Sequence, residues 1–143
     1  MKRSNEIEQL GRDSIAAIER GDLGFVERTT SREQGGVAIG SDASEYATGY
    51  EQIIRLLGDS TPEEGPQIHV RFKEIRGYEQ GDVGWADGTA AFEREGESVE
   101  VRFTMVAVRE KDGWRIVQNH ASIGVPNDRM FDPLFRRMPA ATR

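Results

Sequence analysis

VEVRFTMVAV at residues 99–108 and WRIVQNHAS at residues 114–122 are the most informative part of this sequence. Both stretches are rich in β-branched and aromatic residues, and the residues between them end in Asp-Gly, which is typical of a β-hairpin. A type I turn over residues 110–113, with Gly113 left-handed, makes Glu110 pair with Trp114. The further pairs that this turn predicts are Val108 with Ile116, Val106 with Gln118, Thr104 with His120, and Arg102 with Ser122.

This pairing divides the hairpin into two faces, because directly opposed residues lie on the same side of a sheet. One face is almost wholly apolar and carries Val101, Phe103, Met105, Ala107, Val117, Asn119, Ala121 and Ile123. The other face is mixed and carries Arg102, Thr104, Val106, Val108, Ile116, Gln118, His120 and Ser122. We expect helices to cover the apolar face.

The rest of the chain predicts where those helices come from. Residues 5–20 place Ile7, Leu10, Ser14, Ala17 and Ile18 on one stripe, with Ser4 as the N-cap and Gly21 as the stop. Asp22 caps a second short helix. Residues 37–40 are a candidate strand, and Thr48 with Glu51 predicts the capping box of a third helix that ends at Gly58.

The second half of the chain predicts an antiparallel meander. After a loop at residues 59–66, four strands are expected at 67–78, 83–94, 99–109 and 114–125. Helices followed by a long antiparallel sheet indicate an α+β fold.

Composition excludes several classes of protein. The chain has 143 residues, of which 36% are hydrophobic and 31% charged, as in a globular domain. Its net charge of -6 disfavours nucleic-acid binding, and the absence of cysteine excludes disulfides and thiolate chemistry. No apolar run is long enough to span a membrane, and the first eight residues lack the apolar core of a secretion signal, so we expect a cytoplasmic protein with no membrane partner.

Two segments carry a resemblance to a known family. Residues 112–126, preceded by Arg102-Phe103-Thr104, resemble the closing hairpin of SnoaL-like, nuclear transport factor 2-like proteins. Residues 40–46, followed by Gly49-Tyr50-Glu51, resemble the segment before the third helix of that family. The resemblance implies an α+β cone, in which N-terminal helices lie across a strongly curved antiparallel sheet and leave a pocket. It implies one domain over residues 1–126 and a C-terminal tail over 127–143.

The pocket of such a cone is expected beneath the helices. Its predicted wall consists of Phe25, Tyr46, Tyr50, Phe103, Met105 and Asn119. Asn119 is the only polar residue on the apolar face of the hairpin, so we expect it to orient a small organic ligand.

Asp42 is the candidate catalytic residue. Ketosteroid-isomerase relatives use a carboxylate base on the short strand before the third helix, and Asp42 lies in about that region. The alternative is that Asp42 belongs to a turn and accepts hydrogen bonds from nearby backbone amides.

The mixed face of the hairpin is the candidate homodimer face. In many relatives the outer face of the sheet pairs two subunits, which here involves Arg102, Thr104, Gln118, His120 and Ser122. Histidine is a frequent acid or base, but we interpret His120 as an interface residue because the pocket lies on the opposite face.

Motifs for metals and cofactors are not found in the sequence. The two histidines are far apart, and neither a phosphate-binding loop nor a dinucleotide fingerprint is present, so neither metal nor cofactor is predicted.

Three functions remain open from the sequence. The first is a homodimeric domain that binds a small, largely apolar organic molecule. The second is a cofactor-free isomerase, dehydratase or cyclase acting on a small apolar, polyketide-like or steroid-like substrate. The third is an assembly module with a tightly packed interior and no ligand.

Overall fold

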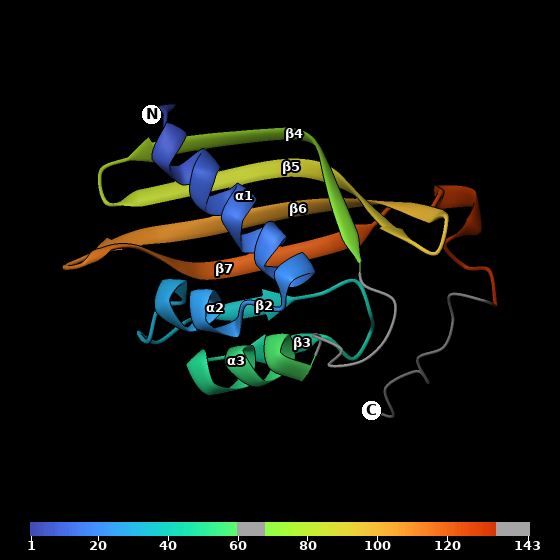
Figure 1. Cartoon of the computed structure of the whole chain (residues 1–143), viewed down its shortest axis with the longest axis horizontal. Helices are drawn as coiled ribbons and strands as arrows, with labels where there is room; N and C mark the ends of the chain where they lie inside the picture. The colour runs from blue at the N-terminus through green and yellow to red at the C-terminus, as the bar shows by residue number, and fades with distance from the viewer. Residues whose placement is uncertain (60–67, 134–143) are drawn as a thin grey trace.

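A computed structural model describes residues 1–59 and 68–133 of the chain. Its seven strands form one sheet in the order β1-β4-β5-β6-β7-β2-β3 (Figure 1). The helices of the described part are α1 (Asn5–Arg20), α2 (Leu23–Thr29), α3 (Tyr50–Asp59) and the short 3₁₀ helix η1 (Asn127–Arg129). The strands are β1 (Lys2–Arg3), β2 (Val37–Ile39), β3 (Tyr46–Thr48), β4 (His69–Gln80), β5 (Val83–Arg94), β6 (Glu97–Glu110) and β7 (Gly113–Ile123).

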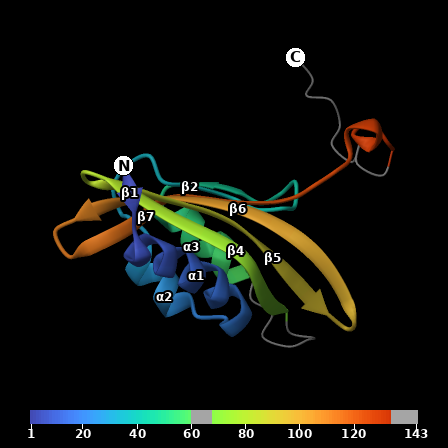
Figure 2. The ribbon, with the colours of Figure 1, turned by 90° about the horizontal axis from the view of Figure 1, so that it is seen from above.

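The three α-helices all cover the same face of this sheet. Seen from above, the long strands β4 to β7 curve strongly around them (Figure 2). All neighbouring strands pair antiparallel except β2 and β7, which are parallel. The sheet is open, because β1 and β3 end its order at opposite edges. The predicted α+β cone is therefore confirmed.

The helix ends form where the sequence indicates them. The Ser4 hydroxyl accepts a hydrogen bond from the Ile7 amide at 3.3 Å, and the Asp22 carboxylate accepts one from the Phe25 amide at 3.0 Å. Gly21 is left-handed, with φ of 60°, and ends α1. The third helix differs from its prediction: the Gln52 side chain, instead of Glu51, accepts from the Thr48 amide at 3.1 Å, and the helix continues past Gly58.

The meander is confirmed: β5 has the predicted bounds, and the other strand ends in the described part are shifted by one or two residues. Two short strands were not predicted: β1, which pairs with β4, and β3, which pairs with β2. Both have only two or three residues, which is too short for an alternating pattern to be recognised. The predicted loop at 59–66 and the start of its following strand at residue 67 lie outside the described residues, apart from Asp59, which ends α3.

The hairpin turn is tighter than predicted, and a bulge compensates for it. Glu110 pairs with Gly113, so that only Lys111 and Asp112 form the loop, and Ile116 pairs with Ala107 instead of Val108. An extra residue in β7, Val117, then interrupts the ladder between the pairs of Ala107 and Val106. Beyond this bulge the predicted pairs are correct: Val106 with Gln118, Thr104 with His120, and Arg102 with Ser122.

Because of the bulge, Ile116 lies on the opposite face of the hairpin from the one predicted. The side chains of Trp114 and Ile116 are buried with Ile7, Met105 and Ala107, on the face that the helices cover. The sequence prediction placed Ile116 on the mixed face, because it assumed a regular ladder from the turn onward. A second cluster, consisting of Ile15, Val70, Ile75, Ala90 and Phe103, lies under the other half of α1.

After β7 the chain leaves the body of the domain (Figure 2). Met130 and Phe131 follow η1 with exposed side chains. Leu134 and Phe135, the other apolar residues of the predicted tail, lie outside the described residues. No helix in residues 1–59 and 68–133 is long and apolar enough to cross a membrane.

The close approach of α1 to β4 occurs at Gly77. The Gly77 carbonyl accepts a hydrogen bond from the Ser4 amide at 2.9 Å. A Cβ atom at this position would lie 2.7 Å from the Ser4 carbonyl oxygen and would also collide with the Glu8 backbone. Only glycine therefore lets the first turn of α1 rest directly on the strand.

We expect Gly77→Ala to destabilise the domain by about 1–3 kcal/mol, because the helix must move away from the sheet. The matched control is Gly58→Ala inside α3, where the added Cβ would lie at an ordinary 3.7 Å from the Leu23 side chain of α2. This variant should leave stability unchanged or raise it by up to about 1 kcal/mol. Urea denaturation measures both. Equal unfolding midpoints for the two variants would contradict the assigned contact.

Candidate ligand-binding cavity

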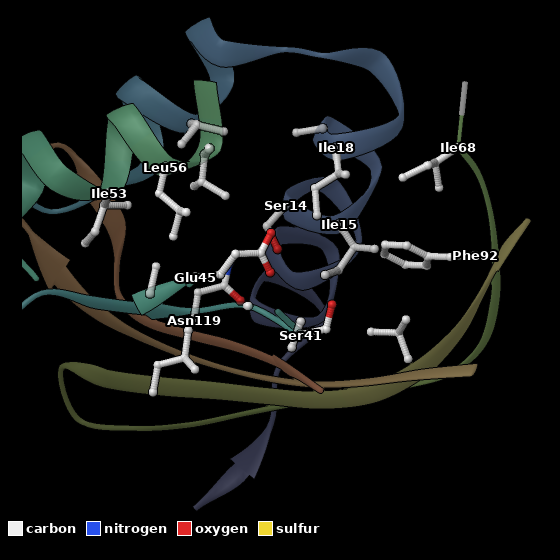
Figure 3. A pocket seen from close by; sticks show the side chains of 18 of the residues that line it. Ser14, Ile15, Ile18, Ser41, Glu45, Ile53, Leu56, Ile68, Phe92 and Asn119 are labelled. Atoms are coloured by element: carbon white, nitrogen blue, oxygen red, sulfur yellow. The ribbon is translucent and has the colours of Figure 1, made fainter. Parts of the chain in front are cut away.

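A cavity of about 470 Å³ lies between the helices and the sheet. This volume is within the range of about 300–1,000 Å³ that is usual for small-molecule sites. The cavity is bounded by the second half of α1, by α2 and α3, by β2, and by the ends of β5 to β7 (Figure 3). It is therefore in the place that the cone fold predicts.

Most of the cavity wall is apolar. Helix α1 contributes Ile15 and Ile18, β5 contributes Phe92, and Ile68, just before β4, lies on the same side as Phe92 (Figure 3). Helix α3 contributes Ile53 and Leu56 on the other side (Figure 3). These side chains offer a ligand a large apolar surface, whose burial stabilises a complex by about 25 cal/mol per Å².

Three polar side chains, those of Ser41, Glu45 and Asn119, gather in one part of this wall (Figure 3). The strand register explains two of them. Ala38 of β2 pairs with Asn119 on one side and with buried Ala47 on the other, so this row faces the helices. Glu45 lies two residues before Ala47, and side chains alternate along a strand, so Glu45 faces the helices as well.

Gly40 makes room for the Glu45 side chain. The Gly40 amide donates to the Glu45 carbonyl at 2.8 Å, and a Cβ atom on Gly40 would lie only 2.6 Å from the Glu45 carboxyl carbon. The carboxylate thus rests over Gly40, and its Oε2 accepts a hydrogen bond from the Asp42 amide at 2.9 Å. The backbone of the β2–β3 turn therefore holds this carboxylate at the cavity wall.

Asp42, the predicted base, lies elsewhere. It is exposed in the β2–β3 turn and is not among the residues that line the cavity. Its carboxylate accepts hydrogen bonds from the Ser44 hydroxyl at 2.6 Å and from the Ser44 amide at 2.9 Å. The hydrogen bond from the Ser44 hydroxyl, and to a lesser degree the one from the Ser44 amide, lowers the pKa of Asp42 below its ordinary value. The structure thus places Asp42 in the turn that was considered as the alternative.

The predicted wall is found in part. Phe25 and Asn119 line the cavity. Tyr46 does not, because its side chain points away from the helices and is 64% exposed. Phe103 and Met105, only 3% and 1% exposed, lie in the core under α1, where the helix covers them and leaves no space.

Tyr50 belongs to a separate shallow hollow at the start of α3. The Arg32 guanidinium lies 4.0 Å from the centre of the Tyr50 ring and donates to the Tyr50 hydroxyl at 2.9 Å. This contact keeps the ring away from the main cavity.

Glu45 is one of the cavity residues that the sequence prediction missed. In GSDASEYAT, at residues 40–48, Glu45 and Ala47 are two positions apart, like Gly40 and Ala38 before the turn. Once β2 and β3 are known to pair, this alternation puts all four residues on the same face, but β3 is too short to be recognised from the sequence. Asp42 lies inside that turn and does not take part in the alternation.

The predicted dimer face is on the opposite side of the sheet. Arg102, Thr104 and Gln118 are exposed there, and His120 and Ser122 are partly exposed. Arg76 and Asp87 continue the row of Thr104 and His120 and form an ion pair at 2.8 Å. His120 therefore has no access to the cavity from its own face.

Metal ligands are not grouped in the described part of the chain. No cluster of three or more His, Cys, Asp or Glu side chains suited to a metal ion occurs there. His69 is exposed, and its Nδ1 lies 2.6 Å from a carboxylate oxygen of Glu19.

Comparison with known proteins agrees with this architecture. The model of a family described as "SnoaL-like domain" matches residues 7–126. A nuclear transport factor 2-like protein of unknown function from Pseudomonas putida KT2440 superimposes with a TM-score of 0.75 at 14% identity, covering 89% of this chain and 93% of that chain. No curated protein matches.

Two further solved structures carry names that suggest an activity. A "putative ketosteroid isomerase" from Parabacteroides distasonis gives a TM-score of 0.68 at 16% identity, covering 86% of this chain and 91% of that chain. A "putative dehydratase" from Streptomyces avermitilis gives 0.67 at 18% identity, covering 82% and 93%. At these identities the likeness establishes the shared fold.

Proposed function

Since this chain belongs to the SnoaL-like domain family, we propose that it binds a small, largely apolar organic molecule between its helices and its sheet. The observation that carries this proposal is the cavity of about 470 Å³, apolar over most of its wall and polar around Glu45 and Asn119. Sites of this kind take their affinity from apolar contact and their specificity from a few polar groups. In this proposal Phe25 contacts the apolar part of the ligand, and Asn119 orients its polar part.

The cavity also supports ligand binding over the assembly module. A module without a ligand has no use for space in its interior, and protein interiors are normally filled close to crystal density. This cavity of about 470 Å³ is about three times larger than the roughly 150 Å³ that one truncated core side chain leaves. A bound molecule would fill this space and restore close packing.

Blocking the cavity should abolish ligand binding. Ala121 lines the cavity on β7, so Ala121→Phe inserts a ring into it. The neutral dye Nile red, which fluoresces in apolar surroundings, should bind the unchanged protein and bind Ala121→Phe at least about tenfold more weakly, given the apolar contact that is lost.

The control for this experiment is Ala43→Phe, which adds the same ring on an exposed turn outside the cavity. It should bind the dye as the unchanged protein does. Equal dye affinity in the two Phe variants would refute binding in this cavity.

A second candidate function is cofactor-free proton transfer, with Glu45 in place of Asp42 as the base. The position of Glu45 favours this second function, because its carboxylate lies on the cavity wall. The names of the isomerase and dehydratase neighbours are in accord with such chemistry. The carboxylate would remove the α-proton of a β,γ-unsaturated ketone, the amide of Asn119 would donate to the enolate oxygen, and the same proton would return to the γ-carbon.

This reaction forms a conjugated enone, whose ultraviolet absorbance follows turnover directly. Under the proton-transfer hypothesis, Glu45→Gln should lower kcat by at least about 100-fold, as expected for loss of a general base. Asp42→Asn should retain activity, because Asp42 lies outside the cavity. Turnover that survives in Glu45→Gln would exclude Glu45 as the base.

We also propose a homodimer through the outer face of the sheet, at Arg102, Thr104, Gln118, His120 and Ser122. Supporting it, this face lies opposite the helices, and the row of Tyr78, Trp85 and Val106 extends it with apolar surface. The rings of Tyr78 and Trp85 are stacked there with centroids 6.1 Å apart. The dimer and a cytoplasmic location stay predictions.

The dimer can be tested by adding a charge. His120→Glu would bury an unpaired carboxylate at the proposed interface, at a cost of several kcal/mol, and should yield a monomer in light scattering. Asn5→Glu adds the same charge on the helix side of the domain and should leave the dimer intact. An unchanged molar mass for His120→Glu would place the interface elsewhere.

A further inference from the structure

The charged groups at the cavity are mainly acidic. Among residues 1–59 and 68–133, its lining includes the carboxylates of Asp22, Glu45 and Glu97 and a single guanidinium, that of Arg94. Arg94 and Glu97 are directly opposite in the register of β5 and β6, next to the turn that joins these strands, so this cation has an acid as its cross-strand neighbour. Asp22 caps α2 and lies 3.9 Å from Arg20. Glu45 is the remaining acid of the wall.

Glu45 has no cationic partner among residues 1–59 and 68–133. It takes part in none of the ion pairs found there, and its Oε2 accepts only the Asp42 amide. The second oxygen, Oε1, makes no hydrogen bond within these ranges. A carboxylate that faces an apolar space with one oxygen unused is well placed to bind a donor from the ligand.

The neighbours of Glu45 are suited to the same donor. The side-chain oxygens of Asn119 and Ser41 lie in the same part of the wall (Figure 3), and neither side chain has a hydrogen bond within the described residues. A primary ammonium group has three N–H donors and no acceptor. One carboxylate oxygen, one amide oxygen and one hydroxyl oxygen match these three donors.

We propose that the cavity selects molecules with a protonated amine on an apolar body, with the ammonium group paired to Glu45. This inference rests on the proposed binding function and names the class of its ligand. The apolar body contacts Ile15, Ile18 and Phe92, while a carboxylic acid of the same shape is repelled by Glu45. The net charge of -6 acts in the same direction on approach.

Three compounds that share a naphthalene ring and differ in one polar group test this preference. They are 2-naphthylmethylamine, 2-naphthylmethanol and 2-naphthoate, measured by titration calorimetry at pH 7. We expect the amine to bind about tenfold more tightly than the alcohol, as for a charge-assisted hydrogen bond, and the acid to bind most weakly.

Four variants test which carboxylate causes the preference for the amine over the alcohol. Glu45→Gln should bring the amine and the alcohol to the same affinity while keeping the alcohol bound. Gly40→Ala keeps the charge but pushes the carboxylate off its resting place, and should reduce the preference as well. Asp42→Asn removes a carboxylate outside the cavity and should leave the preference unchanged. Glu97→Gln removes another acid of the lining and should change the preference less than Glu45→Gln does.

The outcomes separate this inference from the function on which it rests. If the alcohol binds and the amine binds no more tightly, the amine preference is overturned while apolar ligand binding stands. If Glu97→Gln abolishes the preference and Glu45→Gln does not, the assigned partner is wrong. If none of the three compounds binds, the proposed binding function fails, and the preference fails with it.

Discussion

The contact of α1 with the sheet at Gly77 is the constraint on which the rest of the structure depends. It holds the first turn of the helix against β4, while Ile7 and Ile15 fix the helix over the two halves of the core. Helix α1 thus lies across β4 to β7, while α2 and α3 cover the edge formed by β2 and β3 (Figure 1). The cavity lies between these helices and the sheet, bounded by the second half of α1 and by α2 and α3.

Much of the fold was predictable because its signals are local. The caps at Ser4, Gly21 and Asp22 each depend on a few adjacent residues, and the structure has all three. The first pairs of the closing hairpin were wrong, since a two-residue loop and a bulge replace the predicted turn. The predicted and the observed pairing of this hairpin fit the sequence pattern equally well. The packing of Trp114 and Ile116 against Ile7 favours the observed pairing.

The candidate site was less predictable, because it depends on how distant elements meet. Phe25 in its helix and Asn119 in its strand were correctly predicted to line the cavity. Phe103 and Met105 were wrongly predicted to line it, because α1 covers their side chains. Asp42 and Glu45 are three residues apart, and only the pairing of β2 with β3 shows which of them faces the cavity. An acidic residue in a segment rich in Ser and Asp carries no such information alone.

The bulge at Val117 has a consequence for which side chains of β7 face the cavity. It separates the half of β7 that packs in the core from the half that lines the cavity, so each half keeps its own alternation. Were the ladder to continue regularly from Ile116, Gln118 and His120 would turn inward and Asn119 outward. A slip of one position in this single strand would thus remove the Asn119 amide from the cavity and bring the side chains of Gln118 and His120 into it.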